Sequence, residues 1–208
     1  MMTKRKLAGI VLVMLGTLAL SGCAGIAGPS TPTQFYRLID SNSQPEEAIK
    51  AALGPDIQIG IGPIVIPGYA DRPQIVTSGA GGRLNVDDLN HWAEPVQANI
   101  KRIMVANIAT MLNERQVFQY PGNFLPARSS VQVSVEIGDM IRQADGRVLL
   151  SASWNVKRLL DNSLLRRDSV KYISQNTAAD FAQYSKILSQ LFGRLSADIL
   201  TSVVTAQQ

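Results

Sequence analysis

The 208-residue sequence has little of the chemistry on which most enzymes depend. It contains one cysteine, Cys23, and one histidine, His91. No second Cys or His is present to complete a zinc site or to join His91 in a Ser-His or Cys-His catalytic arrangement. A G-x-S-x-G elbow, a P-loop and a complete dinucleotide-binding motif are also missing. We therefore expect no enzyme activity, metal or cofactor, although two of the scattered carboxylates could still meet as a glycosidase-type pair.

The chain also lacks a strong net charge once the three cations of its expected signal peptide are left out. Lys4, Arg5 and Lys6 precede an uncharged, apolar run from Leu7 to Leu20, which is typical of a signal peptide and short for a membrane span. Removing these three cations from the 20 Lys and Arg leaves 17 against 16 Asp and Glu, a net charge of +1. A nearly neutral mature chain gives no reason to expect a nucleic-acid partner.

The only cysteine stands directly after a small-residue cleavage pattern. The apolar run ends in Leu20-Ser21-Gly22-Cys23, which resembles the lipobox of bacterial lipoproteins. The resemblance implies that residues 1–22 are a cleaved signal peptide and that Cys23 is lipidated. Three acyl chains anchor a protein stably without spanning the membrane. The alternative is an ordinary secretory signal followed by an unmodified thiol.

Residues 23–34 are expected to form the lipidated cysteine and a flexible linker, because residues 24–34 are small, polar and rich in Gly and Pro. An extended linker of this length reaches about 35 Å from the bilayer. Residues 35–208 are expected to form one periplasmic domain. With no cysteine left for a disulfide, its stability must come from the hydrophobic core alone.

Hydrophobic periodicity predicts an α/β or α+β domain with a mixed β-sheet. One amphipathic helix is expected from Pro95, and a second is expected to start with the capping pattern at residues 177–180. Alternating strands at residues 131–137 and 148–156, followed by a strand at 167–173, predict an antiparallel meander with turns at Asp145-Gly146 and Asp161-Asn162. Both helices are expected to pack on this sheet.

An earlier strand carries glycines opposite its apolar residues. Ile57, Ile59 and Ile61 alternate with Gly60 and Gly62, so another backbone or a partner is expected to come close on the glycine side. Pro63 follows and lacks a ladder donor, which predicts that this strand or its end lies at a sheet edge. Residues 74–77 and 83–86 are expected to form a hairpin around a glycine-rich tip.

The connection IVIPGYADRPQIV is longer and stiffer than a hairpin turn requires. Two prolines stiffen it, and we expect it to hold Tyr69 and Arg72 outward as partner-binding residues, together with Pro67. In the alternative interpretation, Tyr69 folds back onto the core and Arg72 pairs with Asp71.

Basic residues converge on the expected hairpin around residues 161–162. They are Lys157, Arg158, Arg166, Arg167 and Lys171. The favoured interpretation is a solvated sheet edge that is charged against aggregation. The other is a contact with lipid head groups or an acidic partner, which would make Arg158, Arg166 and Arg167 partner-binding residues.

Several segments, taken in order, resemble the PqiC family of ABC-transport auxiliary lipoproteins. They are Phe35-Tyr36-Arg37-Leu38, Val65-Ile66-Pro67-Gly68-Tyr69, Arg83-Leu84-Asn85, Trp92-Ala93-Glu94-Pro95-Val96 and Ser151-Ala152-Ser153-Trp154. The resemblance covers nearly the whole mature chain and adds Trp92 to the candidate partner-binding residues.

The resemblance implies a non-enzymatic lipoprotein of an intermembrane lipid transport system. Its expected partners are an MCE-domain tunnel protein and the inner-membrane permease or ABC transporter subunits, with phospholipid contact and a homo-oligomer as further expectations. Ala24 after the lipidated cysteine favours the outer membrane under the enteric sorting rule, with the inner membrane as the alternative. A lipid-tethered periplasmic enzyme or solute-binding protein stays open as a second functional class.

Overall fold

The computed structural model describes residues 30–41, 53, 57–112 and 116–207. The expected signal peptide and Cys23 lie outside these described residues. One compact unit spans Thr33–Gln208. Its strands are β1 (Gln34–Tyr36), β2 (Ile59–Val65), β3 (Gln74–Ser78), β4 (Leu84–Trp92), β5 (Val117–Gln119), β6 (Val131–Arg142), β7 (Arg147–Arg158) and β8 (Leu164–Thr177). Its helices are α3 (Val96–Met111), α4 (Phe181–Thr205) and a short 3-10 turn, η1 (Ala80–Gly82).

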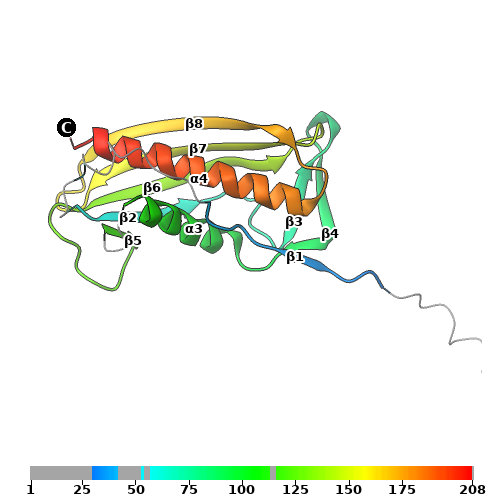
Figure 1. The fold of residues 1–208 in the computed structure, drawn as a ribbon, viewed down its shortest axis with the longest axis horizontal. Helices are drawn as coiled ribbons and strands as arrows, with labels where there is room; N and C mark the ends of the chain where they lie inside the picture. Colours follow the sequence, from blue (N-terminus) through cyan, green and yellow to red (C-terminus); the bar gives the residue numbers. More distant parts are fainter. Residues whose placement is uncertain (1–29, 42–52, 54–56, 113–115, 208) are drawn as a thin grey trace, which may run out of the picture. The chain divides into compact units, whose positions relative to one another are not determined.

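All eight strands belong to one mixed sheet, with β6 at its centre (Figure 1). Along one edge of β6, β7 and then β8 add in antiparallel order and form the predicted meander. Along the other edge, β2 and β3 pair with β6 in parallel, one after the other. Beyond β2 lies β5, and beyond β3 lie β4 and then β1. The predicted fold class, a mixed sheet with two helices, is confirmed.

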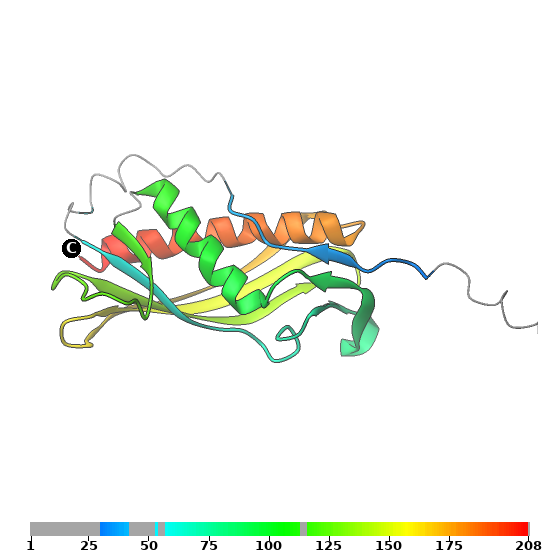
Figure 2. The ribbon, with the colours of Figure 1, turned by 90° about the horizontal axis from the view of Figure 1, so that it is seen from below.

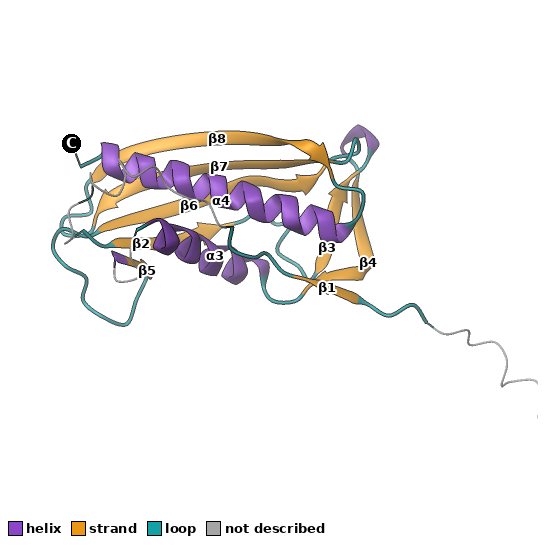
Figure 3. Cartoon of the chain, in the orientation of Figure 1, coloured by secondary structure: helices purple, strands orange, loops and turns teal. Residues whose placement is uncertain are grey.

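Both helices lie on the same face of the sheet (Figure 2). Their apolar stripes join the alternate strand residues in one core that includes Ile100, Met104, Leu188 and Phe192, each fully buried. Figure 3 shows both helices in front of the strands, and the side view shows that the other sheet face carries neither of them (Figure 2). Because side chains alternate along a strand, this arrangement separates each long strand into a core side and an open side.

The start of α4 differs from the prediction. Thr177 still belongs to β8, and the helix begins at Phe181 with Asp180 as its N-cap. The Asp180 carboxylate accepts a hydrogen bond from the Gln183 N–H at 2.7 Å, and the Gln183 side chain accepts one from the Ala179 N–H at 3.1 Å. The capping pair is therefore Asp180 with Gln183, three residues beyond the predicted start.

By length and composition, α4 could cross a membrane, with a mean hydropathy of 1.2 over its most apolar window. Its apolar residues, however, pack into the domain core against β6, β7 and β8. A buried core helix of a globular domain passes the same test, and α4 is such a helix here.

The first residues of β2, Ile59–Ile61, lie between β5 and β6, so β2 as a whole is not an edge strand. Its end pairs with β6 alone among the described strands, which agrees with the prediction that the strand or its end lies at a sheet edge. Pro63 falls where the β2–β6 register shifts between Ile61 and Ile64, so no ladder bond is lost at its nitrogen. The close approach expected at the glycines is made by this chain itself. A Cβ added at Gly60 would lie 2.8 Å from the Phe118 ring on β5.

The segment that follows β1 runs between the two helices. Asn99 of α3 binds both backbone groups of Leu38, at 2.7 and 3.1 Å, and Asn107 accepts the Ser41 N–H at 2.8 Å. From α4, the Ser185 hydroxyl donates to the Arg37 carbonyl at 2.8 Å. These polar side chains satisfy a backbone that has no strand partner there, and they fix where the chain from the N-terminus enters the domain.

Candidate functional site: a groove beside the proline loop

The proline-containing connection spans a gap in the sheet. Strand β2 pairs with β6 as far as Val65 opposite Glu136, and β3 meets β6 only at Thr77 opposite Arg142. Between these points, residues 137–141 of β6 have no strand beside them on that edge in the described chain. Residues 66–73, the proline loop, cross this gap. The loop is long because it replaces a stretch of strand pairing.

Two tyrosines supply the missing backbone partners at Met140 of β6. The Met140 N–H donates to the Tyr69 hydroxyl oxygen at 2.9 Å, and the Tyr184 hydroxyl donates to the Met140 carbonyl at 3.0 Å. Burial disfavours the phenolate and raises the pKa of Tyr69 to about 12. The expectation that the loop holds Tyr69 outward is therefore wrong, and the alternative, in which it folds back onto the domain, is correct.

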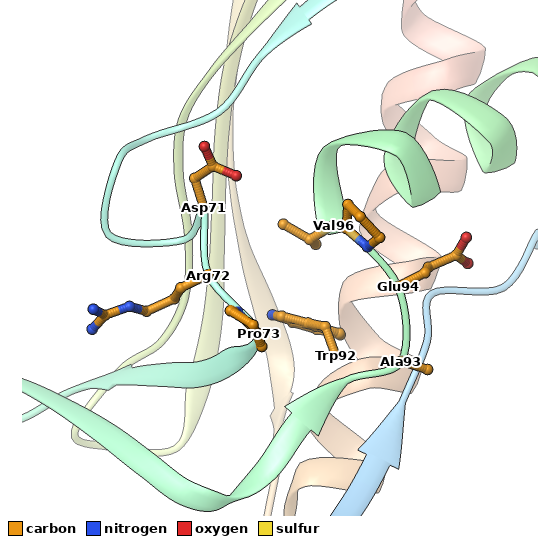
Figure 4. Close-up of a pocket in the computed structure, with 8 residues that line it drawn as sticks. Asp71, Arg72, Pro73, Trp92, Ala93, Glu94 and Val96 are labelled. Carbon is orange, nitrogen blue, oxygen red and sulfur yellow. The ribbon is translucent and has the colours of Figure 1, made fainter.

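A groove lies between the proline loop and the segment that leads into α3 (Figure 4). Its volume is about 350 Å³, at the lower end of the range for small-molecule pockets. The lining residues are Asp71, Arg72, Pro73, Trp92, Ala93, Glu94, Pro95 and Val96. They combine an apolar floor with charged side chains of both signs, which suits a protein segment better than a single charged ligand.

Trp92 is fixed in the groove by the core behind it. It is 6% exposed, and its ring lies 6.1 Å from that of Tyr184 on α4. The Trp92 N–H donates to the Pro73 carbonyl at 2.7 Å, which ties the end of β4 to the end of the proline loop. The two walls of the groove are thus joined by a backbone hydrogen bond, so the groove is preformed.

The charged side chains at the groove differ in whether they have an ion-pair partner. Glu94 is paired with Arg102 of α3. Arg72 is exposed, points away from Trp92 in Figure 4, and has no carboxylate partner among the described residues, so the alternative pairing with Asp71 does not occur. A free guanidinium beside an apolar groove is typical of an interface residue. Arg72 and Trp92 therefore line the same groove, next to the loop that contains Pro67, but the Arg72 guanidinium is directed away from Trp92.

The other three candidate residues lie elsewhere, toward the β7–β8 turn. Arg158 contacts Asp161 at 3.2 Å, and Arg166 contacts Asp168 at 2.5 Å. Arg167 donates to Asn155 at 2.7 Å. Hydrogen bonds from Ser163, and then from Arg158, lower the pKa of Asp161 to about 2.

This hairpin has the character of a charged edge. Strand β8 pairs only with β7 among the described strands, and two cations of the hairpin, Arg158 and Arg166, pair with carboxylates on the same hairpin. The geometry fits the favoured interpretation, an edge protected against aggregation. In the described part of the chain, no three His, Cys, Asp or Glu residues cluster as a metal site.

Sequence reasoning missed the walls of the groove. Asp71, Glu94, Pro95 and Val96 become neighbours only because β4 returns to the end of the proline loop. Tyr184 was expected only as part of a helix stripe, and its hydroxyl bond to β6 has no local signal. The Trp-Ala-Glu-Pro-Val segment was the one usable clue.

A protein family described as the ABC-type transport auxiliary lipoprotein component matches residues 36–200. This chain belongs to that family. The match covers all strands but part of β1 and nearly all of α4, and it confirms the resemblance found in the sequence. Membership indicates a membrane-anchored lipoprotein of the cell envelope that assists an ABC-type transporter. A comparison with curated proteins found no match to this chain.

Solved structures show the same fold at low sequence identity. Protein XCC0632 from Xanthomonas campestris is 13% identical with a TM-score of 0.66, over 84% of this chain and 97% of its own. An uncharacterised protein is 16% identical with a TM-score of 0.61, over 83% and 99%. At such identities, these likenesses support the fold and not a shared activity.

Proposed function

We propose that this protein is a non-enzymatic lipoprotein that docks an MCE-type lipid transport assembly to the outer membrane. Acyl chains on Cys23 hold it in the bilayer, and the groove beside the proline loop binds the tunnel protein. The observation that carries the docking proposal is the preformed groove, in which an apolar floor at Trp92 lies beside an unpaired Arg72.

The partner in the groove is a protein segment with an apolar side chain for the floor and a carboxylate for Arg72. Tryptophan and arginine are the residue types most enriched among interface hot spots, and a groove joined by backbone hydrogen bonds loses little entropy on binding. Glu94 is paired with Arg102. Asp71 is directed toward Val96 and Arg72 away from Trp92, so the carboxylate of the segment meets Arg72 at the rim of the groove, on the other side of the loop from Asp71. Permease or ABC transporter subunits then join through the tunnel protein.

The proposal is tested first at the anchor. Intact-mass analysis of the mature protein should show a chain that begins at Cys23 and carries acyl chains. The Cys23→Ser variant should leave the membrane fraction or keep its signal peptide. A free Cys23 thiol, or an unprocessed Met1, would overturn the lipoprotein assignment. Density-gradient separation of the two membranes should place the wild-type protein with the outer membrane, and recovery with the inner membrane would contradict that placement.

Docking is tested separately, by co-purification from native membranes. The wild-type lipoprotein should bring down an MCE-domain protein, encoded in a neighbouring gene together with a permease or ATPase. Arg72→Glu should lose that partner, because it places a carboxylate opposite an acidic segment. Arg167→Glu, on the distant hairpin, is the matched control and should retain it. Equal recovery with both variants would rule out the groove.

A further inference from the structure

The open face of the sheet carries an apolar band that the core does not use. We call it the outer band, formed by Val76, Val86, Ile141, Leu149 and Ile173. Strand pairing joins them in one row: Ile173 lies opposite Leu149, and Leu149 lies opposite Ile141. The Thr77–Arg142 bridge sets Val76 beside Ile141, and Val86 lies opposite Val76. The row thus crosses β8, β7, β6, β3 and β4.

The outer band is separate from the helix-covered core, because none of its five residues belongs to the central hydrophobic cluster. Its middle is buried, while its ends are open: Val86 is 42% and Ile173 is 44% exposed. Leu84 on the same face of β4 is also exposed. Contiguous apolar side chains on the surface of a soluble domain mark interaction sites, and both ends of this row are exposed.

The rest of the open face is polar, which sets the band apart. Moving along β7 and β8 from the band, the outward positions are polar or charged: Ser151, Ser153, Asn155, Lys171, Ser169 and Arg167. The same strands therefore change from aliphatic to polar and charged side chains within a few residues. Solubility alone would favour polar side chains along the whole face, so the aliphatic end needs another explanation.

The chain that leads to Cys23 enters the domain at this end of the sheet (Figure 1). Strand β1 pairs with the end of β4, and Phe35 lies opposite His91, which lies opposite Gln74, two residues before Val76. Phe35 is 65% exposed and packs edge-on against His91 with 5.9 Å between ring centroids. Alternation along β3 places Phe35 and the outer band on one face.

The length of chain outside the domain limits what this face can meet. Residues 24–33 separate Cys23 from β1, so a lipid anchor holds β1 within about 35 Å of the bilayer surface. Charges beside the band are balanced, with exposed Arg83 and Lys171 against exposed Asp88 and half-buried Asp87. Attraction to an anionic surface therefore contributes little, and any membrane contact there depends on apolar insertion.

We propose that the outer band, with Leu84 and Phe35, is a surface that rests in the head-group region of the bilayer that holds the acylated Cys23. This rests on the lipidation in the proposed function. The contact orients the domain: β1, β3 and β4 face the membrane, and the helix-covered face points away from it. Tethering makes a weak apolar contact effective, because the anchor already keeps the domain at the surface.

The test uses the acylated mature protein in vesicles of phosphatidylcholine. With Cys23 acylated, an introduced cysteine is the only free thiol, so an environment-sensitive fluorophore can be placed at Val86→Cys or Ile173→Cys. Ser169→Cys is the matched control, on the same strand and face as Ile173, and Gln190→Cys reports from the exposed side of α4. Thermal melting confirms that each labelled variant is folded.

The expected result is a blue shift and quenching by brominated phosphatidylcholine at positions 86 and 173, unchanged by salt, with neither effect at positions 169 and 190. A protein that floats with the vesicles but shows no quenching at 86 and 173 would overturn the proposal. Equal quenching at 169 would do so too, as would a blue shift without quenching, which means that a second copy or a partner protein covers the band. Failure to float would instead refute the lipid anchor.

Discussion

The two faces of the central strands differ in what they do for the molecule. On the helix-covered face, Val133, Leu150 and Trp154 are at most 2% exposed and pack under α3 and α4. On the open face, the same strands present serine, asparagine and charged side chains, with aliphatic residues only in the outer band. Because side chains alternate along a strand, one face forms the stabilising core and the other carries the outer band, for which we propose membrane contact. Substitutions on the two faces should therefore have effects of different kinds.

The largest difference is expected between Phe192→Ala and Ile173→Ala. Phe192 is a fully buried residue of α4, and its truncation should cost about 3–5 kcal/mol of unfolding free energy because a cavity remains. Ile173 is exposed on the open face, and its truncation should cost less than about 1 kcal/mol. Urea unfolding of the purified variants measures both. Similar losses of unfolding free energy in the two variants would show that the open face contributes as much to stability as the core does.

A glycine pair sharpens the same comparison. Gly62 lies between β5 and α3 with φ of +129°, and an added Cβ would lie 2.4 Å from the Tyr120 carbonyl oxygen. Gly62→Ala should therefore cost about 2–4 kcal/mol. At Gly138 on the open face, the only close contact of the added Cβ would be with the Ser151 hydroxyl, at 2.9 Å, and that side chain can rotate. Gly138→Ala should lower the midpoint of thermal unfolding much less, and the reverse order would contradict this account of the two faces.

Tyr69→Phe removes one hydrogen bond at the edge of the sheet and should cost about 1 kcal/mol at neutral pH. The folded-state pKa of Tyr69 is raised from 10.0 to about 12, so burial favours the neutral phenol. Its contribution to stability is complete below about pH 10 and is lost as the pH rises toward 12.

Chemical unfolding across this pH range should show a shallower decline for Tyr69→Phe than for wild type. Some decline should remain, since burial also raises the pKa values of Tyr172 and Tyr184. An unchanged pH dependence would mean that Tyr69 is not held against Met140.

The elements themselves could be predicted because their signals are local. Alternation in β6 and β7, the Asp145-Gly146 turn and the stripes of both helices all depend on residues within a few positions of one another. The start of α4 was placed too early because Thr177 offers a plausible cap, whereas its pairing opposite Arg147 keeps it in β8. Strand pairing at a distance overrode the local preference.

The site was predictable only in part, for the same physical reason. Composition marked Tyr69 and Arg72 as interface residues, but the direction of Tyr69 depends on an unpaired N–H at Met140, seventy-one positions away. Likewise, the strand that covers the start of β2 could not be predicted, because β5 is a three-residue strand with almost no periodicity. The gap in pairing beside residues 137–141 of β6 and the short strand β5 produce no pattern in the nearby sequence from which they could be predicted.

The central claim is that the groove beside the proline loop binds the transport partner. Site-specific photocrosslinking in intact cells tests this claim most directly. A photoreactive residue at Arg72 should form an adduct that mass spectrometry identifies as an MCE-domain or other transporter subunit. The same residue at Gln190, exposed on α4, should form none. Adducts of equal yield at both positions, or a protein that folds and reaches the membrane but forms no adduct at position 72, would contradict the account.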